Sequence, residues 1–102
     1  MATHFKVDDY EDFLEMAQRK DFSIAKAVVD AILDNLDTEK KHIHVFEIEV
    51  ENEDAVYDLT VERANFVDAL EKNLIHYERE ELYEECSKIV DAIEFLKTKI
   101  NG

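Results

Sequence analysis

Apolar residues follow two different spacings along the chain, and the changes between them divide the sequence into three parts. In residues 8–36, and again from about residue 62 onward, they recur every three or four positions, which is typical of amphipathic helices. Between residues 43 and 62 they alternate with polar residues, which is typical of strands with one buried face. The pattern predicts two helices, two strands and two further helices.

The first part predicts two helices separated by a break at residues 21–23, where side-chain oxygens can accept backbone N–H groups. The first helix covers residues 8–20, with an apolar face of Tyr10, Phe13, Leu14 and Ala17. The second is expected to end around residues 37–41 and to bury a set at helical spacing: Ala25, Val28, Val29, Ile32, Leu33 and Leu36. Before both helices, residues 4–7 (HFKV) alternate polar and apolar and are a candidate for a short extra strand.

The middle part predicts an antiparallel hairpin with one apolar and one acidic face. Aligning the apolar faces gives three cross-strand pairs: Val50 with Tyr57, Ile48 with Leu59, and Phe46 with Val61. The same alignment sets Glu49 opposite Asp58, a like-charge pair that costs less than the three apolar pairs contribute. We therefore expect the acidic face to lie in water. Because two strands are marginal alone, the helices must cover the apolar face, and a third strand could come from residues 4–7 or from a second subunit.

The last part predicts an antiparallel pair of helices, because two helical sets of apolar residues follow each other closely in sequence. The first set is Phe66, Val67, Leu70, Leu74 and Tyr77. The second set is long and broad compared with what one neighbouring helix can cover, so it is a candidate surface for a partner or a second copy. That candidate surface comprises Leu82, Tyr83, Ile89, Val90, Ile93, Leu96 and Ile100, and Cys86 lies in the same set.

These elements predict a single α+β domain over residues 1–102. Four helices, two N-terminal and two in a C-terminal hairpin, pack on a short antiparallel β-hairpin in the order α-α-β-β-α-α, with the candidate strand at residues 4–7 as an addition. The composition agrees with this class, since 46% of residues are hydrophobic and the chain has one Gly and no Pro.

The charge of the chain limits its partners. Twelve basic and 26 acidic residues give a net charge of −14, which repels phosphate, so we expect neither direct nucleic-acid binding nor binding to an anionic membrane. The N-terminus lacks a basic stretch followed by an apolar run, and no segment approaches the length of a membrane span. The single cysteine, Cys86, cannot form an internal disulfide. We expect a cytoplasmic protein.

Two histidines are the first candidates for site chemistry. His42 and His44 lie two apart at the start of a predicted strand, so their side chains point the same way and could hold a metal, with His4 or a carboxylate completing the site. Lys40 and Lys41 precede them and disfavour a cation, and no third ligand has diagnostic spacing. The sequence therefore predicts two partly exposed histidines without a metal.

A thiol and an acidic cluster are the other candidates. His76 could activate Cys86, but Glu84 and Glu85 flank the thiol, and negative charge and burial both oppose reactivity. The acidic residues of the hairpin tip lack the calcium-loop pattern with its central Gly; they are Glu47, Glu49, Glu51, Glu53, Asp54 and Asp58. No glycine-rich phosphate loop or Gly-x-Ser-x-Gly motif is present, so we expect neither an enzyme nor a cofactor.

Residues 83–93, YEECSKIVDAI, resemble the UVR motif, the antiparallel helical hairpin found at the end of the UvrB excision-repair protein and in some Clp-associated adaptors. That motif runs roughly Phe-Glu-x-Ala-Ala-x-Leu-Arg-Asp-x-Ile, and the matching positions are Tyr83, Glu84, Cys86, Ser87, Ile89, Asp91 and Ile93. Val90 stands where the motif has Arg. The resemblance covers about a quarter of the chain and implies protein–protein contact or self-association through the hairpin. The small, acidic, proline-free chain as a whole also resembles uncharacterised proteins of tailed phages.

Two functional hypotheses remain open from the sequence. The first is a non-enzymatic interaction or accessory protein that binds a partner, or itself as a homodimer, through apolar helical surface. The alternative is an acidic decoy whose carboxylates imitate DNA phosphates and occupy a nucleic-acid-binding protein. Possible segments for such a ridge are EREELYEE and EIEVENED, although charge runs are usually solvated faces.

Overall fold

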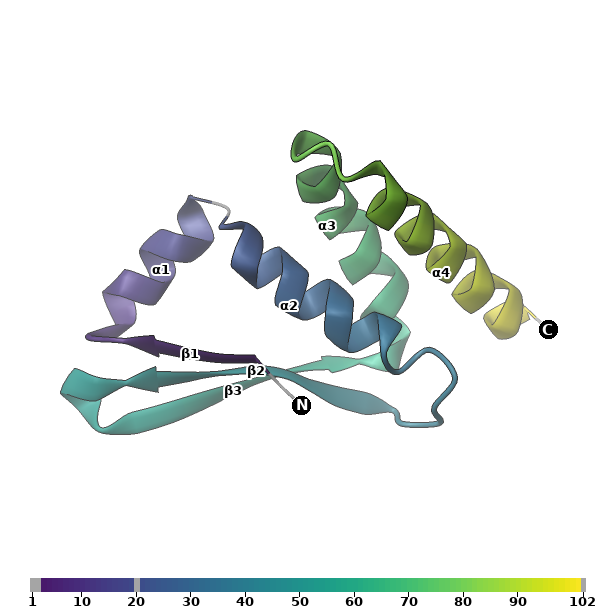
Figure 1. Ribbon diagram of the computed structural model, residues 1–102. Helices are drawn as coiled ribbons and strands as arrows, with labels where there is room; N and C mark the ends of the chain where they lie inside the picture. Colours follow the sequence, from purple (N-terminus) through teal and green to yellow (C-terminus); the bar gives the residue numbers. More distant parts are fainter. Residues whose placement is uncertain (1–2, 20, 102) are drawn as a thin grey trace.

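The computed structural model describes residues 3–19 and 21–101, and of residues 100 and 101 only the backbone. A three-stranded sheet forms one layer, and all four helices lie on one side of it (Figure 1). The elements in chain order are β1 (Thr3–Val7), α1 (Tyr10–Gln18), α2 (Phe22–Leu33), β2 (His42–Val50), β3 (Ala55–Glu62), α3 (Phe66–Arg79) and α4 (Tyr83–Asn101). The predicted α+β class and the four helices are confirmed.

The candidate strand at residues 4–7 is confirmed as β1, so the chain itself supplies the third strand. β1 runs parallel to β2, with Phe5 opposite Ile48, and β3 runs antiparallel to β2. The sheet is therefore mixed, with order β1-β2-β3, and the element order begins with a strand. The Phe5 ring lies 5.3 Å from the Phe46 ring and 6.5 Å from the Phe13 ring, which joins β1, β2 and α1 through aromatic packing.

The predicted hairpin exists, but its predicted register is wrong by two residues. Val50 pairs with Ala55 instead of Tyr57. The turn is shorter than expected because a 3₁₀ turn, Glu51–Glu53, is followed by Asp54 in the left-handed conformation at φ 50°. Aspartate tolerates that conformation better than most residues do. A shift of two residues keeps every side chain on the same face, so the apolar pattern cannot distinguish the two registers.

A β-bulge at Val45 was not predicted. The pairing shifts between His44 and Phe46, which leaves Val45 as an extra residue in β2. Val45 is 1% exposed and Phe46 is 3% exposed, so two consecutive side chains enter the core. The bulge lets the strand keep its apolar face buried from Ile43 to Val50 although the strict alternation of the sequence breaks in the middle.

The break before α2 is confirmed, since the Asp21 carboxylate accepts the Ser23 backbone N–H at 2.8 Å. The predicted buried face of α2 is largely confirmed: Ala25, Val28, Val29 and Ile32 are buried, and Leu33 and Leu36 are half-buried. The expected helix end was wrong, because α2 stops at Leu33. The Asn35 side chain donates to the Ala31 carbonyl at 2.8 Å and stabilises this earlier end.

The predicted apolar face of α1 is buried only in part. Phe13 is half-buried against Phe46, at 5.8 Å between ring centroids, whereas Tyr10, Leu14 and Ala17 are exposed. The helix lies at the margin of the helical layer and packs mainly on β1. Its apolar face therefore extends beyond the surface that the sheet offers for burial.

The C-terminal helical hairpin is confirmed: α3 and α4 pack antiparallel, and α2 contacts both (Figure 1). Phe66, Leu70 and Tyr77 of α3 are buried, as predicted, and Ile89 of α4 is fully buried beside them. One continuous core joins α2, β2, α3 and α4. Within the described residues, no helix is both long and apolar enough to cross a membrane.

Arg63, which the sequence did not single out, ties the connection between α2 and β2 to the start of α3. Its guanidinium donates to the backbone carbonyls of Asn35 (2.8 Å), Leu36 (3.4 Å) and Lys40 (2.7 Å) and to the Thr38 hydroxyl (3.0 Å). Its backbone N–H donates to the Lys41 carbonyl at 2.7 Å. The guanidinium also lies 4.9 Å from the centre of the Phe66 ring. A single side chain thus holds a loop that contains no regular structure.

Candidate functional site

The structure divides the candidate surface of the last helix between core and solvent. Ile89, Ile93 and Leu96 are buried and Leu82 is half-buried, because α2 as well as α3 covers this face of α4. Tyr83 is 67% exposed and Val90 is 41% exposed. The side chain of Ile100 lies outside the described residues. Most of the set closes the core, and Tyr83 and Val90 remain as surface.

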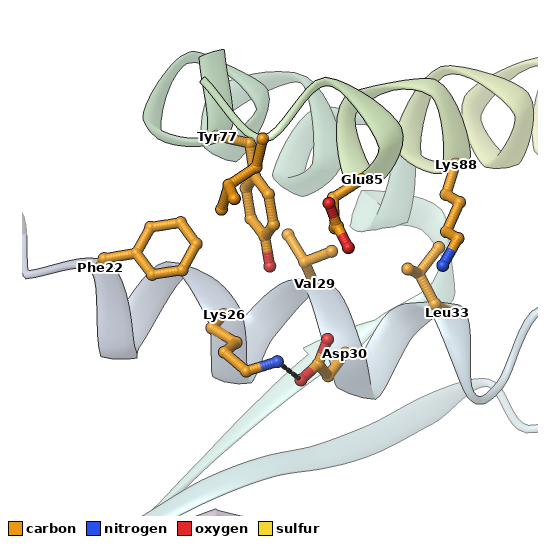
Figure 2. Close-up of a pocket in the computed structure, with 9 residues that line it drawn as sticks. Phe22, Lys26, Val29, Asp30, Leu33, Tyr77, Glu85 and Lys88 are labelled. Carbon is orange, nitrogen blue, oxygen red and sulfur yellow. Dashed lines mark hydrogen bonds and ion pairs between the residues drawn. The ribbon is translucent and has the colours of Figure 1, made fainter. Parts of the chain in front are cut away.

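A small cavity of about 170 Å³ opens where α2, α3 and α4 meet (Figure 2). Its lining comprises Phe22, Lys26, Val29, Asp30, Leu33, Tyr77, Leu82, Glu85 and Lys88. Figure 2 shows the Tyr77 hydroxyl directed toward α2, and the Lys26 ammonium bonded to the Asp30 carboxylate at 2.9 Å. The volume is below the roughly 300 Å³ at which small-molecule pockets begin. The enclosed part of the cavity has room for about one side chain.

Tyr77 is the most strongly perturbed ionisable group described. Its side chain is 3% exposed, and the Phe22 ring packs against it at 4.8 Å between centroids. Burial, with a smaller contribution from the negative charges of Asp30 and Glu85, raises the pKa of Tyr77 to about 12. The hydroxyl therefore stays protonated at physiological pH and can only act as a neutral hydrogen-bonding group.

The pKa of the Cys86 thiol is shifted in the direction that opposes reactivity. Burial, and then the negative charge of Glu78, raises the pKa of the Cys86 thiol, which opposes thiolate formation. The Nδ1 atom of His76 lies 2.9 Å from the Arg79 guanidinium. The expected structural role of Cys86 on the inner side of α4 agrees with its half-buried position.

The sheet face opposite the helices carries ion pairs. Glu47, not Glu49, lies opposite Asp58. Each of these two carboxylates has a histidine ring nitrogen beside it, His4 at Glu47 and His44 at Asp58. The closest pairs on this face are His4–Glu47 at 3.0 Å, His44–Asp58 at 3.1 Å and Lys6–Glu51 at 2.9 Å. The acidic face lies in water, as expected, and several of its carboxylates are already paired.

The histidines and the hairpin tip show no metal geometry. In residues 3–19 and 21–101, no three side chains of His, Cys, Asp or Glu converge as metal ligands. Two acidic residues of the tip contact different partners: Glu51 pairs with Lys6, and Glu53 accepts a hydrogen bond from Tyr57. A hydrogen bond and ion pair with Glu51 raises the pKa of Lys6, and a 2.8 Å hydrogen bond to Glu53 raises the pKa of the Tyr57 hydroxyl.

An exposed apolar surface lies where α1 meets β3. It comprises Tyr10, Leu14, Tyr57 and Leu59, and we call it the α1–β3 shelf; each side chain is 39–42% exposed. The Tyr10 and Tyr57 rings touch, with centroids 5.5 Å apart. The apolar pattern of the sequence placed all four residues on buried faces. It could not show that the helical layer covers β1 and β2 and leaves β3 largely bare.

Comparison with known proteins found no similar family model, no similar curated protein and no similar solved structure. What the chain does is therefore inferred from its own surface and the chemistry of its side chains. Among the features described, the α1–β3 shelf stands out, because it brings together exposed large apolar side chains of two elements, with the Tyr10 and Tyr57 rings in contact.

Proposed function

We propose that the chain is a non-enzymatic interaction protein of the cytoplasm that binds a partner protein, or a second copy of itself, through exposed apolar surface. The α1–β3 shelf is the observation that carries this proposal. Two aromatic rings and two leucines there remain about 40% exposed although the same sheet face is buried under helices a strand away. Contiguous apolar surface of this kind on a small protein marks interaction sites, and tyrosine is enriched in them.

The C-terminal helical hairpin supports a second contact area. Tyr83 and Val90 are seven residues apart, so they share one face of α4, and both are exposed. They belong to the segment that resembles the UVR motif, for which contact through the hairpin is the implied role. The decoy alternative has less support, because carboxylates on the open sheet face are paired with His4, His44 and Lys6.

The proposal predicts that a photo-crosslinking amino acid at position 57 captures a protein that a matched position does not. We would place p-benzoylphenylalanine at Tyr57 and, as the control, at Ile75, which is exposed on α3. In native-host cells the Tyr57 variant should yield a defined adduct, because a bound partner covers the shelf. The adduct should disappear when Leu59→Asp is added, since a charge there opposes apolar contact.

The mass of the adduct separates the two kinds of partner, because a second copy gives twice the mass of the chain. Light scattering on the purified chain provides an independent measure of self-association. Thermal unfolding of the Leu59→Asp variant must match the parent to exclude a folding defect. Equal capture from positions 57 and 75, or no capture from position 57, contradicts the assignment of the shelf.

A further inference from the structure

The outer edge of β3 is an unpaired strand edge that is long and carries no lysine. β3 spans eight residues and pairs only with β2, so no strand in the described part of the chain covers its outer side. β1, the opposite edge strand, is five residues long and carries Lys6. Short length and lysine are two ways in which proteins protect edges from pairing. β3 has neither protection, and Val56 is 55% exposed on it.

The two faces of β3 differ in chemistry. On the helix side, Tyr57 and Leu59 continue the α1–β3 shelf, so apolar surface lies directly beside the free edge. On the open side, Val56, Asp58, Thr60 and Glu62 are exposed, and β3 contains no Lys, Arg or His. One oxygen of Asp58 lies 3.1 Å from the His44 ring, and the rest of the carboxylate faces solvent. A strand added at this edge would therefore meet apolar side chains on one face and carboxylates on the other.

We propose that β3 accepts, as a fourth strand, an extended segment of a partner protein in which apolar residues alternate with Lys or Arg. The inference rests on the proposed interaction function and names the chemistry of its partner. Main-chain hydrogen bonds to the free edge hold the segment, as in other cases of strand addition. Its apolar side chains cover the α1–β3 shelf, and its cations lie over Asp58 and Glu62.

A second copy of the chain fits this edge less well than a basic segment. Two-fold antiparallel pairings centred on residue 57, 58 or 59 overlap most of β3 and place Tyr57 and Leu59 of both copies on one face. In each of them Asp58 of one copy lies opposite or diagonal to Asp58 of the other, within the distance at which cross-strand side chains interact. Each chain also carries a net charge of −14, which opposes association with itself.

The test uses a synthetic peptide of about ten residues with alternating Val and Lys, long enough to span β3. Binding would be followed by amide chemical shifts of the isotope-labelled chain. We expect shifts concentrated in residues 55–62 and at Tyr10, and binding that weakens as salt is added. The matched Val–Glu peptide should bind at least tenfold more weakly. A Val–Lys peptide with methylated alternate amides should also lose binding, because it cannot form the strand hydrogen bonds.

Charge reversal on the protein gives a second comparison. The Asp58→Lys, Glu62→Lys double variant should bind the Val–Lys peptide at least tenfold more weakly than the parent. The Glu84→Lys, Glu94→Lys variant changes the net charge equally at exposed sites on α4 and should stay within twofold. Equal loss in both variants would show general attraction of a basic peptide to an acidic protein, and would overturn the proposal.

Three further results separate this inference from the proposed function. Equal binding of the acidic peptide, or shifts confined to α3 and α4, overturns the basic-strand inference while capture from position 57 still supports an interaction protein. A dimer of the free chain with all β3 amides already protected overturns it in favour of a second copy. Failure of capture from position 57, together with failure of the peptide to bind, contradicts both the proposed interaction function and the basic-strand inference.

Discussion

Replacing Arg63 with alanine is expected to lower the free energy of unfolding by about 2–4 kcal/mol. The guanidinium donates four hydrogen bonds to the connection between α2 and β2, and this connection contains neither a helix nor a strand. Hydrogen bonds from a charged donor contribute more than neutral ones, and removing the donor takes this partner from the Leu36 and Lys40 carbonyls, whereas the Asn35 carbonyl still accepts from Thr38. Loss of the guanidinium above the Phe66 ring adds a smaller amount.

Chemical denaturation of three variants measures this effect and its cause. Arg63→Lys keeps the positive charge but loses the forked donor geometry, so it should recover less than half of the loss. Lys72→Ala removes one positive charge from an exposed ion pair with Asp68 and should change stability by less than about 0.5 kcal/mol. If Arg63→Ala is no more destabilising than Lys72→Ala, the hydrogen bonds of the Arg63 guanidinium do not stabilise the connection between α2 and β2.

Raising the pH from 10 to 12 is expected to remove about 2 kcal/mol of stability through Tyr77 alone. The pKa of Tyr77 is raised to about 12 in the folded chain, against an ordinary value of 10.0. The folded state therefore binds more protons than the unfolded state in this interval, and stability falls as pH rises through it. Below about pH 9 the hydroxyl is protonated in both states, so no dependence on this group is expected there.

Tyr77→Phe isolates the contribution of this hydroxyl, because the ring that packs against Phe22 is retained. Urea unfolding of the parent and the variant at several pH values between 9 and 12 gives the two slopes. The parent should lose stability more steeply than the variant, with the difference developing between pH 10 and 12. Parallel slopes would mean that Tyr77 ionises as easily in the folded chain as in the unfolded chain.

The sequence predicts the helices well because each of their signals is local. Asp21 lies in the break between α1 and α2 and caps α2, and the spacing from Ala25 to Ile32 identifies the buried face of that helix. The pattern fails where an element lies at the margin of the fold. Tyr10 and Leu14 have the spacing of a buried face, yet β3 next to them is an edge, and no local signal records which strand the helices cover.

The hairpin shows a different limit. Alternation identifies the faces of both strands but not their register, because a shift of two residues leaves the pattern unchanged. The left-handed Asp54 and the bulge at Val45 decide the register, and neither has a distinctive sequence signal. Arg63 has none either, because most of its partners are backbone carbonyls, which any residue could supply.

The exposure of the α1–β3 shelf depends on tertiary features that the sequence pattern does not show. The long candidate surface on α4 proved to be mostly core, since α2 packs on it together with α3. The surface left exposed at β3 depends on strand order and on the placement of α1. Both are tertiary properties set by distant contacts, such as that of Phe5 with Phe46.

Amide hydrogen exchange along β3 in the free monomeric chain tests most directly whether this edge is open. Amides of an antiparallel edge strand alternate between the paired side and the free side. We therefore expect slow and fast exchange at alternate residues of β3, and slow exchange throughout Phe46–Val50 of β2, which has a strand on each side. Uniformly slow exchange along β3 would mean that its outer edge is already covered, and would contradict the account.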